Sequence, residues 1–176
     1  MRVYLGGAQG VGKTSIAKLF VDRNPKYSRC SGSELLMSIC GVATRKELEN
    51  IDKRTHEYAE SVGYVNHVRN FENLIVDGHF ELNELQVNCF KFFVYITCPA
   101  TLVVNRIEKD NTRKRNSDYA YIENDLKRHL QRIEDFKKRY SKAPLYVFNN
   151  KGSIEKTVKK LETLVNQYNL QCEGGV

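Results

Sequence analysis

The residues most capable of chemistry stand near the start of the chain, in the stretch GAQGVGKTS at 7–15. It contains the spacing Gly-x-x-x-x-Gly-Lys-Thr, with an apolar stretch before it and a helical pattern after it. Glycines let the backbone curl so that several N–H groups point at one phosphate, and the following helix adds the positive end of its dipole. The stretch therefore predicts a nucleotide-binding loop, formed by Gly7, Gln9, Gly10, Val11, Gly12, Lys13, Thr14 and Ser15.

Two side chains of this loop and one further along the chain could act on the phosphates. Lys13 supplies a full positive charge to the outer phosphates, and the Thr14 hydroxyl is a ligand for Mg²⁺. Asp77 ends the apolar stretch at 74–77, and in open α/β sheets ligands bind at the carboxyl ends of the strands. A carboxylate there holds Mg²⁺ through water, so Thr14 and Asp77 are the predicted metal residues. The competing interpretation of Asp77 is a residue that only caps a helix or a turn.

Arginines further along the chain are candidates for catalytic groups that act with Lys13. Arg106 lies in a predicted helix, and Arg113 and Arg115 lie in the polar loop DNTRKRNSD at 110–118. Phosphoryl transfer requires the charge on the phosphate oxygens to be neutralised and water to be excluded, and a loop with arginines does both when it closes. The planar guanidinium of arginine can also donate hydrogen bonds to two phosphate oxygens at once. The competing interpretation is that these arginines are solvated surface charges.

Short apolar stretches that would position these residues alternate with helical patterns. Strands are predicted at 2–6, 27–30, 74–77, 92–97 and 145–149, and helices at 13–23, 51–69, 100–109, 119–140 and 153–168, with a small helical insertion at 31–50. The longer strands are nearly continuous in apolar residues, which is typical of a parallel sheet covered on both faces. The alternation predicts an α/β fold with three layers, α/β/α, and a five-stranded parallel sheet. We expect residues 169–176 to fray.

Length and composition indicate one domain of the ordinary globular kind. The 176 residues are 41% hydrophobic and 28% charged, with a net charge of +7 at pH 7. This charge suits an anionic ligand such as a nucleotide, and it equally suits RNA. The chain has no apolar run of about 18 residues and no signal-peptide pattern, so we expect a cytoplasmic protein without a membrane span. Its five cysteines lack the C-x-x-C spacing of zinc sites.

The order of motifs along the chain resembles that of nucleoside monophosphate kinases, most of all the archaeal-type adenylate kinases. The likeness covers about residues 2–168 and rests on GAQGVGKTS, VDGHF, PATLVVNRIEKDNTRKR and FNNKGSIEKTVKKLETLV. GTPases fit less well, because NNKG at 149–152 lacks the aspartate of their base-reading motif. Large remodelling ATPases are disfavoured by the length of the chain.

The resemblance implies one P-loop kinase domain with a core at 1–30, 71–109 and 119–168, an acceptor-nucleotide insertion at 31–70 and a short lid at 110–118. It implies the cofactors ATP and Mg²⁺, and transfer of the γ-phosphoryl group of MgATP to a nucleoside monophosphate, AMP by default. Arg106 and the lid arginines Arg113 and Arg115 would bridge the two nucleotides. Asn149 and Lys151, in the turn after the last strand, would flank the adenine.

The chain departs from the commoner adenylate kinases at the acceptor site. Those enzymes carry DGFPR where this chain has DGHF at 77–80, so the arginine that binds the acceptor in them is missing here. Archaeal forms resemble this chain in having a histidine nearby, which makes His79 the substitute, with Arg45 as the candidate for the acceptor phosphate. CMP, UMP or a deoxynucleotide would also fit such a site. The predicted acceptor-binding residues are Ser31, Gly32, Arg45, Asp77 and His79.

Three other functions stay open. An adenylate-kinase-like ATPase that acts on RNA or in ribosome assembly would use the net positive charge and the predicted helix at 119–140, and it would hydrolyse ATP without an acceptor. A kinase of another small-molecule acceptor and a nucleotide sensor without enzyme activity are the other two. Archaeal-type adenylate kinases are often trimers, so the resemblance also allows a homo-oligomer.

Overall fold

The fold is built on a parallel sheet whose strands all end at the same edge. The computed structural model describes residues 1–110 and 115–173, and across them five parallel strands form one sheet in the order β2-β3-β1-β4-β5. The strands are β1 (Arg2–Gly6), β2 (Ser28–Ser31), β3 (Leu74–Gly78), β4 (Phe92–Thr97) and β5 (Leu145–Asn149). The prediction of a five-stranded parallel sheet is confirmed. Because the strand order changes direction at β1, ligands are expected at the carboxyl end of this strand.

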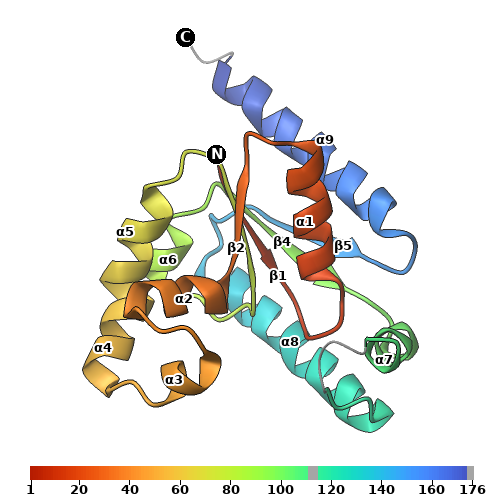
Figure 1. Ribbon diagram of the computed structural model, residues 1–176. Helices are drawn as coiled ribbons and strands as arrows, with labels where there is room; N and C mark the ends of the chain where they lie inside the picture. The colour runs from red at the N-terminus through yellow and green to blue at the C-terminus, as the bar shows by residue number, and fades with distance from the viewer. Residues whose placement is uncertain (111–114, 174–176) are drawn as a thin grey trace.

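Helices cover both faces of the sheet, which gives the predicted three layers (Figure 1). One face packs against α1 (Lys13–Arg23), α7 (Ala100–Glu108) and α9 (Ile154–Glu173), and the other against α5 (Tyr64–Arg69), α6 (Glu84–Val87) and most of α8 (Tyr119–Arg139). Successive residues of a strand point to opposite faces. In β4, accordingly, Phe92 and Val94 belong to the buried cluster on the face of α1, α7 and α9. Phe93 and Tyr95 belong to the buried cluster on the opposite face.

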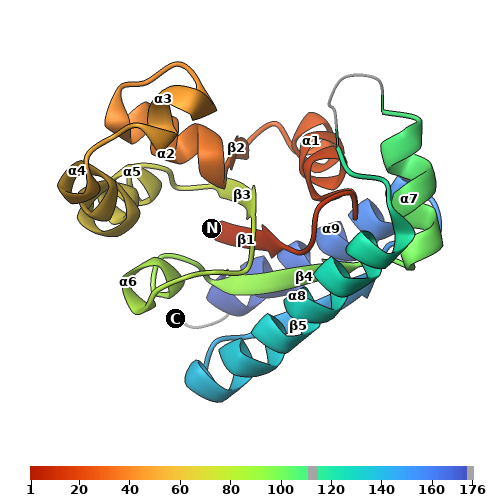
Figure 2. The same ribbon diagram turned by 90° about the horizontal axis from the view of Figure 1, so that it is seen from below.

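The segment between β2 and β3 is helical, and it lies beside the carboxyl ends of the strands, across from α7 (Figure 2). It contains α2 (Gly32–Cys40), α3 (Arg45–Glu49), α4 (Lys53–Tyr58), the π-helical turn η1 (Ala59–Gly63) and α5. The first two helices begin with capping boxes, in which Ser31 pairs with Glu34 and Thr44 with Glu47. The helical insertion is therefore where the sequence places it, and its role in acceptor binding stays a prediction.

The predicted helix at 51–69 is wrong in two respects. It begins at Lys53, because the side chain of Asp52 caps it and accepts a hydrogen bond from the Thr55 N–H. The π turn then adds one residue to a helical turn, so the spacing of 3.6 residues no longer predicts which residues face the core. Tyr58, Val62 and Val65 recur at helical spacing, which predicts one apolar face, yet Tyr58 and Val62 are 54% and 49% exposed.

The last strand and the last helix also differ from expectation. The strand β5 lies at the edge of the sheet rather than in its middle, so Val147 is 52% exposed although its sequence predicts a buried strand. The helix α9 continues to Glu173, beyond the point at 169 where fraying was predicted. The Ser153 hydroxyl accepts a hydrogen bond from the Lys156 N–H at 3.4 Å, as expected of a residue that caps the start of this helix. No helix within the described residues has the length and apolar character needed to span a bilayer.

A pair of apolar truncations tests this arrangement. The Phe93 side chain is 1% exposed, and its ring packs against those of Tyr4, Phe80, Phe90 and Phe136. Phe93→Ala is expected to lower the free energy of unfolding by about 3–5 kcal/mol, since it leaves a cavity. Val147→Ala, at the exposed edge, is expected to change it by only about 0.5 kcal/mol. Urea titration followed by circular dichroism measures both, and equal losses would contradict the placement of β4 and β5.

Candidate active site

The glycine-rich loop leaves the end of β1 and enters α1 with its backbone pressed against other elements. Gly10 and Gly12 adopt φ angles of 77° and 99°, in the left-handed region that side chains disfavour. A Cβ atom on Gly12 would lie 2.6 Å from Nδ2 of Asn150, and one on Gly10 would lie 2.7 Å from a methyl carbon of Val103. Both glycines are therefore required by the backbone conformation and by the space around it.

The side chain of Lys13 folds back into this loop. Its Nζ atom donates hydrogen bonds to the carbonyl oxygens of Gly7 at 2.8 Å and Ala8 at 2.7 Å. Burial lowers the pKa of Lys13 to about 8, and the nearby carboxylate of Asp77 acts in the opposite direction. The ammonium group is thus desolvated, mostly charged at neutral pH, and held at the centre of the loop.

Asp77 lies across from the start of α1 and is 3% exposed. Its Oδ2 atom accepts a hydrogen bond from the Thr14 hydroxyl, and its Oδ1 atom accepts one from Nε of Arg29, both at 2.7 Å. The predicted metal residues are therefore adjacent. They offer oxygen atoms, the donor type that Mg²⁺ prefers, and Mg²⁺ usually takes its remaining ligands from phosphates and water. No group of three or more His, Cys, Asp or Glu side chains suited to a metal occurs among the described residues.

Arg29 is a site residue to which the sequence did not point. It is 14% exposed, and its Nη1 atom lies 3.5 Å from Oε2 of Glu34 in addition to the pairing with Asp77. The signal that could have found it is a charged residue inside the short strand predicted at 27–30, because a buried arginine requires an acidic partner.

Arg106 lies against the outer side of the glycine-rich loop. Its Nη1 atom donates to the Val11 carbonyl at 3.2 Å and contacts the Cys98 sulfur at 3.3 Å, while its Nη2 atom donates to the Asn150 carbonyl at 3.0 Å. These contacts tie α7 to the loop and to the turn after β5. The predicted bridging of two nucleotides by Arg106 stays a prediction, since in this conformation its guanidinium binds backbone carbonyls.

The turn after β5 contacts the glycine-rich loop through Asn150, which lies between the two residues that the sequence singled out. Asn149 and Lys151 are exposed, whereas Asn150 is fully buried. The Asn150 amide donates to the Val11 carbonyl at 2.8 Å, and its Oδ1 atom accepts from the Thr157 hydroxyl at 3.1 Å. Asn150 therefore holds the loop in place, and the adenine-flanking role of its neighbours stays a prediction.

The predicted lid at 110–118 is described only in part. Arg113 lies outside the described residues. Arg115 is described, and its Nη1 atom lies 3.4 Å from Oδ2 of Asp110. Its side chain lines the same cleft as Lys13 and is 16% exposed. A positive charge thus stands at the predicted place, beside the end of α7.

The predicted acceptor residues lie on the wall formed by α2, by the start of α3 and by the end of β3. Ser31 caps α2, and Nη2 of Arg45 donates to the Ser33 hydroxyl at 3.1 Å. The ring of His79 lies 5.5 Å, between centroids, from the ring of the buried His129 on α8. Loss of hydration and, next, the charge of Lys13 lower the pKa of His79, so this side chain is neutral at pH 7 and offers a hydrogen bond rather than a charge.

A cleft of about 1400 Å³ brings most of these residues together. It runs from the glycine-rich loop to α2 and α3, with Arg106 and Arg115 on the same side of the sheet as Lys13. The predicted residues that line it are Gln9, Gly10, Gly12, Lys13, Thr14, Ser15, Ser31, Gly32, Arg45, Asp77, His79, Arg106 and Arg115. Gly7 and Val11 are buried residues of the loop, and their carbonyl oxygens accept hydrogen bonds from Lys13 and Arg106.

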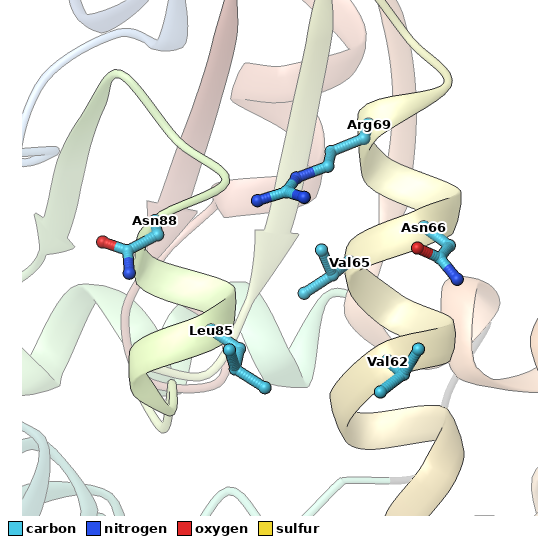
Figure 3. Close-up of a pocket in the computed structure, with 6 residues that line it drawn as sticks. All are labelled: Val62, Val65, Asn66, Arg69, Leu85 and Asn88. Atoms are coloured by element: carbon cyan, nitrogen blue, oxygen red, sulfur yellow. The ribbon is translucent and has the colours of Figure 1, made fainter.

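A smaller pocket of about 250 Å³ lies between α5 and α6 (Figure 3). Val62, Val65 and Leu85 form its apolar part, and Asn66, Asn88 and Arg69 its polar part. It has no glycine-rich loop and no carboxylate among its lining residues, so the chemistry expected from the sequence belongs to the large cleft.

A model of the family described as AAA domain matches residues 3–131 of this chain. The match includes the glycine-rich loop, the helical insertion, Asp77 and the first part of α8. No curated protein sequence matches the chain.

Solved structures of shikimate kinases have a similar fold. The enzyme from Bacteroides thetaiotaomicron superposes with a TM-score of 0.67 at 16% identity, over 94% of this chain and 98% of that one. The enzyme from Acinetobacter baumannii in complex with shikimate gives 0.67 at 18% identity, over 96% and 94%. The enzyme from Aquifex aeolicus gives 0.63 at 20% identity, over 97% and 99%. At such low identity the likeness concerns the fold, which is that of P-loop kinases.

Substitution of the buried asparagine tests the support of the loop. Asn150→Ala removes the hydrogen bonds to the Val11 carbonyl and from the Thr157 hydroxyl, so it is expected to lower the free energy of unfolding by about 1–3 kcal/mol. Hydrogen exchange of the amides in the glycine-rich loop should also become faster. Asn149→Ala is the matched control, because that side chain is exposed, and it should change the unfolding free energy by only about 0.5 kcal/mol. Equal effects of the two variants would show that Asn150 does not hold the loop.

Proposed function

Since the chain belongs to the AAA domain family and has the fold of P-loop kinases, we propose that it transfers the γ-phosphoryl group of MgATP to a nucleoside monophosphate, with AMP as the first acceptor to test. The observation that carries this proposal is the cleft in which Lys13, Asp77 and Arg115 face the wall that bears Arg45. The volume of about 1400 Å³ exceeds the roughly 300–1000 Å³ of pockets for one small ligand, and so suits a donor and an acceptor side by side.

The donor side of the cleft fits ATP and Mg²⁺. The N–H groups of the glycine-rich loop and the start of α1 favour an anion, and Lys13 would exchange its two carbonyl partners for phosphate oxygens. Thr14 and Asp77 would hold Mg²⁺ directly or through water, since their oxygen atoms lie only 2.7 Å apart. The bound metal would neutralise charge on the phosphates and orient them. The arginines at the lid side would add positive charge where charge develops in the transition state.

The acceptor side fits a substrate that is already nucleophilic. A phosphate oxygen of a nucleoside monophosphate is anionic at neutral pH, so positioning and charge neutralisation suffice and no general base is required. Arg45 and the start of α2, with Ser31 and Gly32, would bind this phosphate. His79 would donate or accept a hydrogen bond, since the lowered pKa keeps it neutral.

A hydroxyl acceptor is the second candidate, favoured by the fold likeness to shikimate kinases, one of them in complex with shikimate. A carboxylate on such a substrate could pair with Arg45. Its hydroxyl would need a base, and Asp77 is the carboxylate nearest to the loop. Both oxygens of Asp77 already accept hydrogen bonds, from Thr14 and Arg29, which makes it a poor base. The nucleoside monophosphate is therefore the better candidate.

The basic helix α8 gives less support to an RNA partner than its composition suggests. Four of its cations pair with carboxylates within 4.0 Å: Lys127 with Glu123, Arg128 with Asp125, Arg132 with Glu81 and Lys137 with Glu134. Such pairing lowers the charge available for phosphates of a nucleic acid.

The proposed reaction belongs in the cytoplasm, where thiols stay reduced. Within the described part of the chain, Cys30, Cys40, Cys89 and Cys98 are free thiols.

A coupled assay of phosphoryl transfer from ATP tests the function. AMP, CMP, UMP, GMP, dTMP and shikimate are offered in turn, and turnover is expected with a nucleoside monophosphate. Lys13→Ala should lower kcat by about 10²–10³-fold with an unchanged circular dichroism spectrum, because it removes a charge next to the transferred group. Lys53→Ala is the control, since Lys53 is 90% exposed on α4. Turnover with shikimate alone, or with no acceptor at all, would contradict the proposal.

The desolvated lysine predicts how nucleotide affinity depends on pH. With its pKa lowered to about 8 in the free protein, Lys13 loses its charge at a lower pH than an ordinary lysine. The charged form binds phosphate, so affinity for a non-hydrolysable analogue of MgATP should be full at about pH 7 and fall as the pH rises to about 9. Calorimetric titration across this range measures the effect. Lys13→Met should bind more weakly and with little dependence on pH, and an equally steep fall in that variant would exclude Lys13 as the cause.

A further inference from the structure

We propose that Arg29 is a positioning residue of this cleft, which holds the Asp77 carboxylate in place and leaves Lys13 free for phosphate. The inference rests on the proposed function, because it concerns the same MgATP site. Arg29 lies on β2, outside the glycine-rich loop and outside every stretch in which the sequence indicated chemistry.

The hydrogen bonds around Asp77 define this role. One oxygen of the carboxylate accepts from Thr14 on α1, and the other accepts from Nε of Arg29 on β2, both at 2.7 Å. Partners on two different elements fix the rotation of the carboxylate, which a single partner would not do. Asp77 is 3% exposed and the Arg29 side chain 14% exposed, so solvent weakens the ion pair little.

The charge of Arg29 also decides the partner of Lys13. Asp77 is the charged group that acts most strongly on Lys13, yet the Lys13 ammonium donates to the carbonyls of Gly7 and Ala8. A buried carboxylate without its cation is strongly destabilised and attracts another positive group. With Arg29 absent, the Asp77–Lys13 ion pair would form, and the lysine would be withdrawn from the phosphate position.

Arg29 also connects the two walls of the cleft. Its Nη1 atom lies 3.5 Å from Oε2 of Glu34, and the same carboxylate oxygen accepts the Ser31 N–H at 2.7 Å in the capping box of α2. The orientation of Asp77 at the donor side is thereby tied to the first turn of the helix that forms the acceptor side.

A direct contact of Arg29 with the acceptor is the competing interpretation, because its side chain also lines the cleft. Its guanidinium is already paired with the carboxylates of Asp77 and Glu34, which argues against that contact. In the register of β2 and β3, Arg29 stands beside Ile75, whereas Ser31 stands beside Asp77 at the end of the strand. The guanidinium must therefore extend toward the carboxyl ends of the strands to meet Asp77. Arg45 contacts Ser33 in the first turn of α2, beyond the strand end, and is the better candidate for the acceptor phosphate.

Four variants test the proposal with a readout that needs no turnover: Arg29→Met, Arg29→Lys, Asp77→Asn and the double variant Arg29→Met with Asp77→Asn. The probe is a non-hydrolysable ATP analogue with Mg²⁺, titrated by calorimetry, and kcat and KM for both substrates are then measured. Arg29→Met should weaken binding of the analogue at least tenfold and lower kcat, with KM for the acceptor changed less than twofold. Arg29→Lys should recover part of the affinity, because it restores the charge.

The double variant separates action through Asp77 from direct binding. Asp77→Asn removes the charge that would capture Lys13, so adding Arg29→Met to it should cause less than a twofold further loss of analogue affinity. Additive losses, or an acceptor KM that rises while analogue binding stays normal, would overturn the proposal. Should Arg29→Met fail to fold, the double variant, which has no unpaired buried charge, and Arg29→Lys still decide the question.

Arg139→Met is the matched control, since Arg139 is exposed in the last turn of α8 and its loss changes the net charge equally. It should leave analogue binding as in the unmodified protein. The proposed function and the role of Arg29 fail in different ways. If the unmodified protein does not bind the MgATP analogue, the function fails. If it binds and Arg29→Met binds equally well, only the role of Arg29 fails.

Discussion

The carbonyl oxygen of Val11 is the point at which the rest of the protein holds the glycine-rich loop. A loop with glycines in left-handed conformations has few side chains of its own to fix its path, so its shape depends on contacts from outside. Asn150 and Arg106 both donate to this oxygen, from segments more than ninety residues further along the chain. The turn after β5 and the helix α7 thus determine where the loop N–H groups point, and through them where a phosphate could lie.

The same principle extends to the charges of the cleft. Lys13 is held by carbonyl oxygens, Asp77 by a hydroxyl and a guanidinium, and Arg115 by Asp110. Each of these three charged groups has a partner that fixes its position, and under the proposed function Lys13 would exchange its carbonyl partners for phosphate oxygens. Electrostatic groups fixed in advance, in a partly dehydrated cleft, are the arrangement that stabilises developing charge most effectively.

The fold alone does not decide the acceptor. Shikimate kinases share this architecture at 16–20% identity, and one architecture can host many different functions, so the acceptor must be argued from the wall opposite the glycine-rich loop. In this chain that wall combines Arg45, a capped helix start and a neutral histidine. These features underlie the proposal of an acceptor with a negative charge. Within that proposal, the monophosphate is preferred to an alcohol because both oxygens of Asp77 already accept hydrogen bonds, which makes this carboxylate a poor base.

Local sequence determined the parts of this protein whose chemistry is contained in a short stretch. The glycine spacing with Lys13 and Thr14, the apolar strands and Asp77 at a strand end follow from residue types within a few positions of one another. The tertiary structure decided what depends on partners distant in the chain. It made Asn150 a buried support of the loop while the neighbouring Asn149 is exposed, because a shift of one residue exchanges the buried and exposed sides of an extended segment. It paired Arg29 with Asp77 across two strands, and it left Tyr58 and Val62 exposed beside a π turn. A pattern along one segment cannot specify such contacts, since they are fixed only when separate elements pack together.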